Sequence, residues 1–248
     1  MSYEQFKKEC EEEIRNQGMD EEFRARSSKW IERAQQMRYS YHFEWLGRPI
    51  IQYPQDILAL QEIIWAVKPN VIVETGIAHG GSLIFSASML ELNAACGGPA
   101  DAEVLGVDID IREHNRKAVE SHPMYKRVQM LEGSSIDPET IERVRRRVEG
   151  KERVLVFLDS NHTHDHVLAE LQAYAPLVTA GSYCVVLDTL VEDLPEELFR
   201  DRPWGPGNNP KTAVQSYLKA HPEFEINNLI EDKLMISVAP SGYLKRVR

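Results

Sequence analysis

The sequence predicts an open α/β sheet, mostly parallel, that finishes with a C-terminal antiparallel hairpin and is preceded by N-terminal helices. Three observations predict this fold. Short apolar runs, such as 71–74 and 154–159, alternate with stretches of helical spacing, as buried parallel strands and their crossover helices do. Two apolar runs near the C-terminus, 224–230 and 234–240, are separated by only three residues, which is typical of a hairpin. The first 37 residues are rich in charge and carry apolar residues at helical spacing.

The N-terminal segment, residues 2–37, predicts two amphipathic helices with a break near residues 16–18. Their polar faces are either solvated surface or in part the contact of a homo-oligomer. A bridging segment rich in aromatic residues follows, and a helix is expected from Asp56 to just before Pro69. We therefore expect a helical extension over residues 1–52 and a main domain over residues 53–248.

The main domain is expected to alternate strand and helix. The expected strands are 71–74, 104–108, 128–131, 154–159 and 183–188, and the helices between them are 82–95, 113–121, 138–149 and 165–178. Asn209 and Pro210 read as the N-cap and first residue of a helix that runs to His221. The connection 190–210 holds Trp204 and four prolines, and is either a lid over the carboxyl edge of the sheet or a flexible insertion.

Composition excludes several classes of protein. With 248 residues, 42% of them hydrophobic, the chain can bury a full-sized core. A net charge of −10 argues against bulk attraction to nucleic acid or to an anionic membrane. The three cysteines are too far apart for a disulfide framework or a paired-cysteine zinc site. With no signal peptide and no long apolar run in this sequence, we expect a cytoplasmic protein.

A glycine-rich turn follows the first strand of the predicted sheet, in the frame E-x-G-x-x-x-G from Glu74 to Gly80. It fits neither the dinucleotide fingerprint nor the phosphate-binding loop. Asp108, at the end of the second strand, is placed to accept hydrogen bonds from ribose hydroxyls. Ser82 opens a helix whose N-terminus favours a negative group. The turn is alternatively a plain loop of an α/β fold, in which Glu74 merely ties the loop down.

Two carboxylates end neighbouring strands of the sheet, Asp159 and Asp188, and a histidine, His162, follows the first of them by three residues. Carboxylate oxygens suit Mg²⁺ or Mn²⁺, and a histidine is a natural proton acceptor near neutral pH. In the alternative reading the aspartates only cap helices. His164 and His166 alternate with His162, a spacing that points them apart at a helix start, so we do not expect a three-histidine site.

A series of segments carries a family resemblance. The segments, in chain order, are VIVETGIAHGGSLIFSASMLE, VLGVDIDIR, LDSNHTHDHVLAEL, GSYCVVLDT, WGPGNNPKTAV and SVAPSGYLKRV. From about Tyr53 to the C-terminus, they resemble the cephalosporin hydroxylase/rhamnosyl O-methyltransferase family. The resemblance implies a Rossmann-like class I methyltransferase sheet that binds S-adenosylmethionine and a divalent metal, Mg²⁺ or Mn²⁺.

The resemblance also implies roles for single residues. The implied cofactor-binding residues are Glu74, Gly76, Gly80, Ser82, Asp108 and Ser135, the last in the segment that lines adenine in such enzymes. It implies metal binding by Asp159 and Asp188, and proton acceptance by His162, as in similar sugar O-methyltransferases of macrolide pathways. The sequence departs from some relatives at Leu187, where they carry a second carboxylate, so one metal ligand is missing.

Two functions remain in view. The first is an S-adenosylmethionine-dependent, metal-dependent O-methyltransferase that acts on a hydroxyl of a sugar or a secondary metabolite, with Asp159 and His162 catalytic. The second is a cofactor-binding accessory subunit of a partner enzyme, such as a hydroxylase, without full catalysis. Leu187 keeps the second reading open. In either case the expected partners are a small hydroxylated molecule and further copies of the chain.

Overall fold

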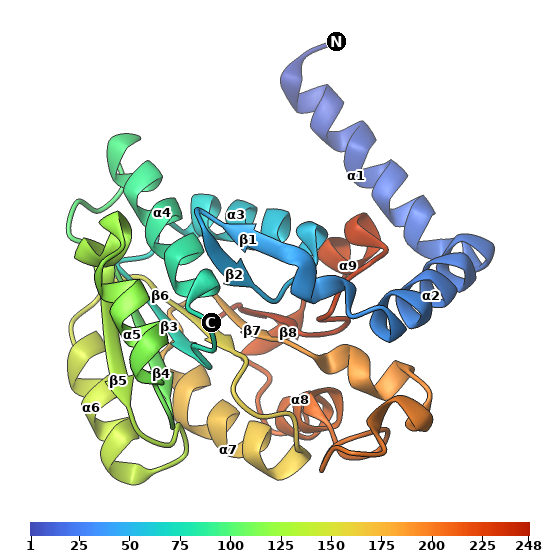
Figure 1. Ribbon diagram of the computed structural model, residues 1–248. Helices are drawn as coiled ribbons and strands as arrows, with labels where there is room; N and C mark the ends of the chain where they lie inside the picture. Colours follow the sequence, from blue (N-terminus) through green and yellow to red (C-terminus); the bar gives the residue numbers. More distant parts are fainter.

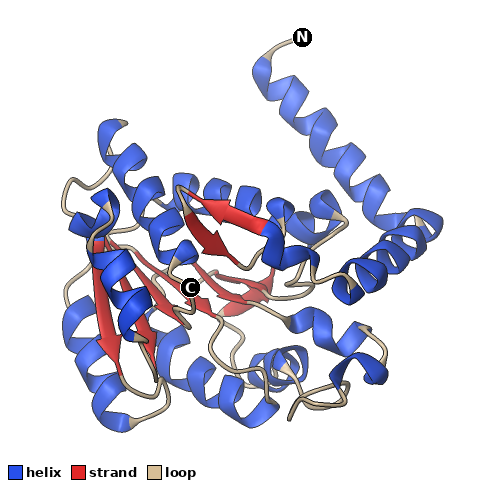
Figure 2. Cartoon of the chain, viewed as in Figure 1, coloured by secondary structure: helices blue, strands red, loops and turns tan.

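The computed structural model describes all 248 residues, and its centre is a seven-stranded sheet with helices on both faces (Figure 1; Figure 2). Its strands are β3 (Val71–Thr75), β4 (Glu103–Asp108), β5 (Val128–Glu132), β6 (Val154–Leu158), β7 (Tyr183–Val186), β8 (Phe224–Ile226) and β9 (Tyr243–Arg246). Their order is β5-β4-β3-β6-β7-β9-β8. The strands β3 to β7 are parallel, while β9 runs antiparallel to both β7 and β8. The predicted Rossmann-like fold is confirmed.

Helices cover both faces of the sheet (Figure 1). The helices that follow residue 53 are α3 (Pro54–Val67), α4 (Gly81–Ala95), α5 (Glu113–Glu120), α6 (Pro138–Val148), α7 (His164–Tyr174), α8 (Pro210–Leu218) and α9 (Asn228–Leu234). One buried apolar cluster joins the sheet to α3, α4 and α5, and a second joins it to α6, α7 and α8. None of the helices combines the length and the apolar character needed to span a bilayer.

The centre of the sheet is a topological switch point. The strands β3 and β6 are neighbours, and the amide of Asp159 after β6 donates to the Thr75 carbonyl at 3.0 Å. From β3 the chain continues to β4 on one side, whereas from β6 it continues to β7 on the other. The loops at the carboxyl ends of β3 and β6 therefore diverge, and a crevice for ligands opens between them.

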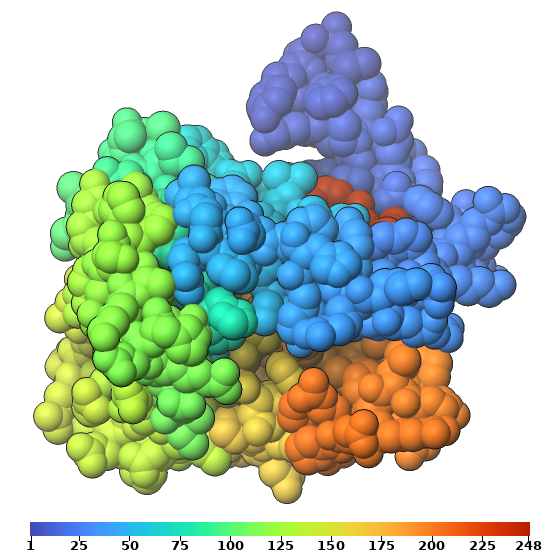
Figure 3. All heavy atoms as spheres, in the orientation of Figure 1, coloured from blue at the N-terminus to red at the C-terminus, as the bar shows by residue number.

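The two N-terminal helices form as predicted, as α1 (Tyr3–Met19) and α2 (Glu21–Gln36). The break lies at Asp20 and not at residues 16–18, because the Asp20 carboxylate accepts from the Phe23 amide at 2.9 Å and caps α2. The start of α1 projects away from the body, which Figure 1 and Figure 3 both show. Its end is fixed to α9, since Gln17 Nε2 donates to the Asp232 carbonyl at 2.7 Å.

A small hairpin, β1 (Phe43–Trp45) and β2 (Arg48–Ile50), follows these helices and was not predicted. Its two turn residues, Leu46 and Gly47, both have positive φ, at 48° and 81°. Leucine is not a residue that marks such turns, so the sequence carries little signal for this hairpin. Trp45 Nε1 donates to Ser88 Oγ on α4 at 2.9 Å, which fixes the hairpin to the main domain.

The C-terminal hairpin was predicted in the wrong place. Residues 228–234 form α9, and the last strand is β9, so residues 234–240 are not the second strand. The physical reason is a competing partner: the buried Asp56 carboxylate accepts from Ser237 Oγ at 2.6 Å and from the Val238 amide at 2.9 Å. This apolar segment is thereby tied to α3. The strand that pairs antiparallel with β7 and β8 is instead β9, which follows it in the chain.

The remaining element ends differ little from expectation. Helix α7 ends at Tyr174 and continues as a short 3₁₀ turn, and α8 ends at Leu218 instead of His221. Asn209 caps α8 as predicted, with a reciprocal bond between its backbone and Thr212. The connection between β7 and α8 contains two 3₁₀ helices, η4 (Thr189–Asp193) and η5 (Glu196–Phe199).

Candidate active site

A cavity of 480 Å³ opens at the carboxyl edge of β3, β6 and β7. Its floor is formed by the loop after β3 and by the residues that end β6 and β7. Residues of the N-terminal segment 35–52 form one wall, and residues 190–204 form another. In Figure 3 this recess lies between the blue N-terminal segment and the orange residues near 200. The cavity therefore occupies the place where ligands bind in open α/β sheets.

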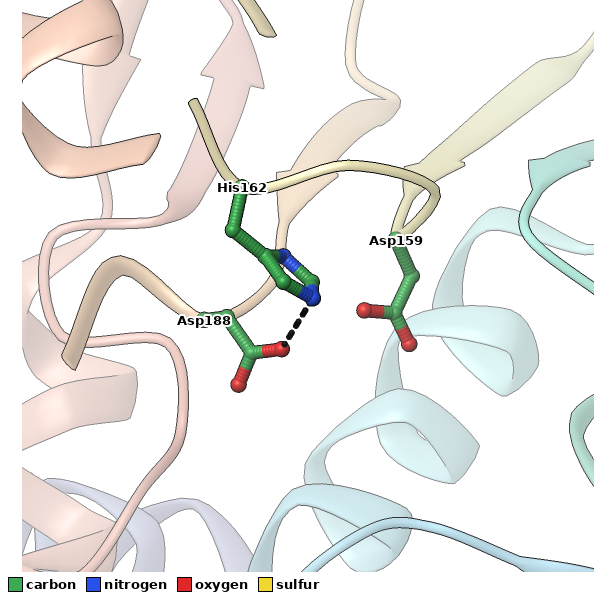
Figure 4. A group of neighbouring side chains, drawn as sticks. All are labelled: Asp159, His162 and Asp188. Carbon is green, nitrogen blue, oxygen red and sulfur yellow. Dashed lines mark ion pairs between the residues drawn. The ribbon is translucent and has the colours of Figure 1, made fainter. Parts of the chain in front are cut away.

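Three predicted residues meet at the floor of this cavity: Asp159, His162 and Asp188. One ligand atom from each lies within 4.8 Å of the others. His162 Nε2 is 3.3 Å from Asp188 Oδ2, and the Asp159 carboxylate faces them (Figure 4). The structure thus brings together the three side chains that the sequence singled out, whereas their individual contacts were not predictable.

Backbone geometry directs one of these carboxylates. The strand β7 ends at Val186, and Asp188 adopts the left-handed conformation with φ of 53°. This conformation is uncommon for residues other than glycine, and aspartate tolerates it better than most. The chain turns there into η4, and the Asp188 carboxylate is left facing His162.

The site carries an excess of negative charge. Burial raises the pKa of Asp159 well above its usual value, and the neighbouring carboxylates of Asp188, Glu74 and Glu170 raise it further. The ion pairs made by these four acids are only with histidines, His162 and His166, and no Lys or Arg pairs with any of them. A divalent cation is a natural complement to such a group of acids.

Unpartnered polar atoms lie at the same place. Gln52 Nε2 donates to Asp159 Oδ2 at 3.2 Å, while Gln52 Oε1 is buried without a hydrogen-bond partner. His162 Nδ1 is also buried and unpartnered. Buried polar atoms are usually satisfied, so these exceptions indicate a site built for a group that binds there. The oxygen atoms of the two carboxylates and of the Gln52 amide are the kind of donors that Mg²⁺ and Mn²⁺ prefer.

Sequence reasoning missed Gln52, because no motif surrounds it and because it lies in the extension outside the predicted sheet. It also missed the cavity wall formed by Gln35, Arg38 and Tyr41. These residues come close to the site only because α2 and the β1–β2 hairpin fold over the edge of the sheet. A sequence signal was absent, since nothing in the local pattern of this segment indicates its tertiary neighbours.

The glycines of the loop after β3 are explained by contacts within the chain. Gly76 has a φ of 89°, and a Cβ there would collide with the Asp159 carbonyl oxygen. A Cβ on Gly81 would collide with the Pro49 carbonyl oxygen. The absence of side chains at Gly76 and Gly81 therefore lets the end of β6 and the N-terminal segment approach the loop closely. Of the predicted cofactor residues, Gly76 and Ser82 line the cavity, whereas Glu74, Gly80, Asp108 and Ser135 do not.

Asp108 shapes the same loop from behind. Its Oδ2 accepts from the amides of Ile77 and Ala78 at 2.8 and 3.3 Å, and its Oδ1 accepts from the Asp110 amide at 3.1 Å. The backbone conformation of the loop therefore depends on this carboxylate. Asp108 remains partly exposed at the end of β4, beside the switch point.

Glu74 lies beneath the loop and is 2% exposed. Ser86 Oγ donates to its Oε2 at 3.4 Å, and its Oε1 has no partner. Burial raises the pKa of Glu74 to about 7, an increase that the Ser82 and Ser86 hydroxyls partly offset. The residue is thus positioned to hold β3 against the start of α4.

Ser135 belongs to a polar network with Ser160 and the start of α7, and it is itself buried. Its Oγ lies 3.0 Å from His166 Nε2, and Ser160 Oγ donates to the buried Glu170 at 2.6 Å. His164 Nδ1 instead contacts Thr212 Oγ1 at 2.8 Å. His164 and His166 therefore have partners of their own, and neither belongs to the group of Asp159, His162 and Asp188.

The connection after β7 reaches over the cluster. The rings of Trp204 and His162 meet edge to face, with centroids 4.8 Å apart. Leu194, Leu198 and Phe199 also line the cavity. The outer wall is therefore apolar and aromatic, while the floor is acidic.

Comparisons with known proteins agree with this description. Residues 37–247 match the profile of the family described as Rhamnosyl O-methyltransferase/CmcI. A rhamnosyl O-methyltransferase of Mycobacterium tuberculosis (strain H37Rv) is 32% identical over 198 residues, which are 77% of this chain and 73% of the relative. The rhamnosyl O-methyltransferase of Mycobacterium leprae is 30% identical over 204 residues, 82% of either chain.

Solved structures share the fold. A CmcI structure with Mg and SAM superposes with a TM-score of 0.58, at 19% identity, and covers 84% of this chain and 78% of that one. A cofactor-bound structure of Rv0187 from MTB gives a TM-score of 0.51 at 16% identity, covering 80% of each chain. At these identities the likeness concerns the architecture alone.

Proposed function

The chain belongs to the rhamnosyl O-methyltransferase/CmcI family, and on that premise we propose that it uses S-adenosylmethionine and a divalent cation to methylate a hydroxyl group of a sugar or another small hydroxylated compound. The observation that carries this proposal is the cluster of Asp159, His162 and Asp188 on the floor of the 480 Å³ cavity. The cavity volume falls within the range of small-molecule sites.

The chemistry required is the removal of a proton from a weakly acidic hydroxyl. When bound, S-adenosylmethionine would supply the methyl group, and a cation held by Asp159 and Asp188 would lower the pKa of the acceptor hydroxyl. His162, on the cavity floor beside Asp188, accepts the proton. Trp204 limits the motion of the imidazole through its edge-to-face contact, and so helps to hold the base in place.

The cofactor side of the site is assigned from the loop after β3. Gly76 and Ser82 line the cavity, so the methionine end of the cofactor would lie against them. Asp108, at the end of the neighbouring strand, is assigned to the ribose, and Ser135, after β5, to the adenine. The N-terminus of α4 at Gly81 favours the cofactor carboxylate.

The test is a methyl-transfer screen with radiolabelled S-adenosylmethionine over hydroxylated glycosides and polyketide-like compounds, with Mg²⁺ and with EDTA. We expect transfer to at least one neutral hydroxyl acceptor. EDTA should reduce turnover, and added Mg²⁺ or Mn²⁺ should restore it, while cofactor binding survives. Turnover that is indifferent to EDTA and to added metal would remove the cation from the proposal.

One observation favours a second candidate, an accessory subunit that binds the cofactor without full catalysis. Leu187, beside Asp188, is 4% exposed and packs into the apolar core, so it provides no metal ligand. The same screen separates the two candidates. Tight cofactor binding without transfer to any acceptor, and transfer only after a partner enzyme is added, would favour the accessory role.

A further inference from the structure

The proposed metal site has few protein ligands for a cation that prefers six. Asp159 and Asp188 offer carboxylates, and His162 is assigned to the proton, so most of the coordination shell is left to other groups. Mg²⁺ and Mn²⁺ prefer six ligands, mostly oxygen atoms. Leu187 is buried among apolar side chains and contributes none. The question is which side chain of this molecule supplies a further oxygen.

Gln52 is the candidate with the required position and burial. It follows β2, is 3% exposed, and lines the same cavity as Asp159 and Asp188. One end of its amide lies 3.2 Å from Asp159 Oδ2. Its Oε1, at the other end of the amide, is buried without a donor, so this oxygen is free to bind another group once the amide is turned.

We infer that Gln52 is a ligand of the divalent cation and that its Oε1 takes the place of the carboxylate absent at Leu187. This inference rests on the proposed function, because it assumes the cation at Asp159 and Asp188. Adjacent ligand atoms on an octahedral cation, with bonds of 2.0–2.1 Å, lie about 3 Å apart. The amide of Gln52 is 3.2 Å from Asp159 Oδ2, which matches that spacing.

Coordination requires the Gln52 amide to exchange its nitrogen and oxygen by half a turn about its last torsion. The two orientations are nearly equal in shape, so the turn needs no other movement. It breaks no hydrogen bond at Oε1, since that atom has none. It gives up the bond from Nε2 to Asp159, and the cation replaces this bond because it binds both oxygen atoms.

The β1–β2 hairpin of the N-terminal segment carries Gln52 to the site. Gln52 reaches the site because the β1–β2 hairpin is fixed to α4, with Trp45 Nε1 bonded to Ser88 Oγ. Several residues of the segment 35–52 thus wall the cavity, and Gln52 is the one among them that reaches the metal site. An amide oxygen is neutral, so this shell holds the cation less tightly than three carboxylates would.

The experiment measures Mn²⁺ binding to the full chain by electron paramagnetic resonance, and counts bound water from water-proton relaxation. Gln52→Leu should weaken Mn²⁺ binding about tenfold or more and add one water ligand. Gln35→Leu is the matched control: it removes another cavity-lining amide of the same segment, one that donates to Tyr53 Oη at 3.0 Å. It should leave affinity and hydration unchanged.

Gln52→Glu distinguishes a ligand from a mere hydrogen-bond donor. A ligand role predicts tighter Mn²⁺ binding and no added water, because a carboxylate replaces the amide oxygen. A donor role predicts weaker binding, because the N–H to Asp159 is lost and two carboxylates repel.

Unchanged affinity and hydration in Gln52→Leu, or weaker binding in Gln52→Glu, would overturn the inference. If Gln52 fails this test but Asp188→Asn still abolishes Mn²⁺ binding, the proposed function stands and only the role of Gln52 is lost. A wild-type chain that binds no Mn²⁺ would overturn both.

Discussion

His162 Nε2 lies 3.3 Å from Asp188 Oδ2, although the two residues follow different strands, β6 and β7. The contact orients the imidazole, and the ring of Trp204 meets the same imidazole edge to face. Asp188 is also assigned to the cation, so one carboxylate serves both the base and the metal.

Replacing the base should slow the chemical step. His162→Ala should lower turnover roughly 100-fold or more, because a positioned general base contributes about that much. Its cofactor affinity should stay close to that of the wild type. The measurement is single-turnover methyl transfer, with His164→Ala as the control because His164 contacts Thr212 instead of the site. Equal rates in His162→Ala and the wild type would remove this residue from the mechanism.

The acid at the end of β4 should matter for cofactor affinity. Asp108→Ala should weaken S-adenosylmethionine binding by about 1.5–3 kcal/mol, the range for hydrogen bonds to a charged group. Part of this loss arises because the carboxylate also holds the Ile77 and Ala78 amides. Calorimetry measures the change, with the exposed Asp110→Ala as control. An unchanged affinity would show that the cofactor does not use this strand end.

The aromatic wall should affect the acceptor more than the cofactor. Trp204→Ala removes the ring packed on His162 and opens the cavity to water. We expect the acceptor KM to rise about tenfold, since losing a well-packed aromatic contact costs more than 1 kcal/mol, with cofactor affinity unchanged. Trp65→Ala, on the exposed side of α3, is the control. A loss of cofactor binding alone would contradict a lid over the acceptor.

The buried Glu74 should make stability depend on pH. Its pKa of about 7 lies above the ordinary 4.5, so the folded state keeps this proton to higher pH than the unfolded state. The stability that this bound proton contributes is therefore fully present below about pH 4.5 and is lost as the pH rises to about 7. The loss in free energy of unfolding is roughly 3 kcal/mol, at about 1.36 kcal/mol per pH unit. Glu74→Gln should flatten this fall in thermal unfolding measured from pH 4 to 8. Parallel pH profiles of the two chains would contradict the shift.

The projecting helix is expected to hold copies of the chain together. Its apolar residues Phe6, Cys10 and Ile14 share one face at helical spacing, and Phe6 is exposed. A chain without residues 1–15 keeps the Gln17 bond to α9, so its main domain should remain intact. Light scattering should show a smaller number of subunits for the shortened chain. The same number of subunits in both chains would place the oligomer contact elsewhere.

The sequence by itself determined the alternation of strands and helices from β3 to β7 and the acids at the strand ends. Buried parallel strands read as apolar runs, and their ends at Asp108, Asp159 and Asp188 mark one edge of the sheet whatever the side-chain details. The cap at Asn209 was readable because capping is local chemistry. These features depend on residues close together in the chain.

Only the tertiary structure decided which distant segments meet. Residues 234–240 read as a strand by composition, yet Asp56, far away in sequence, binds Ser237 and the Val238 amide and keeps them out of the sheet. Gln52 reaches Asp159 across 107 positions of the chain. Such contacts depend on how whole elements pack, and the local pattern around either partner carries no record of the other.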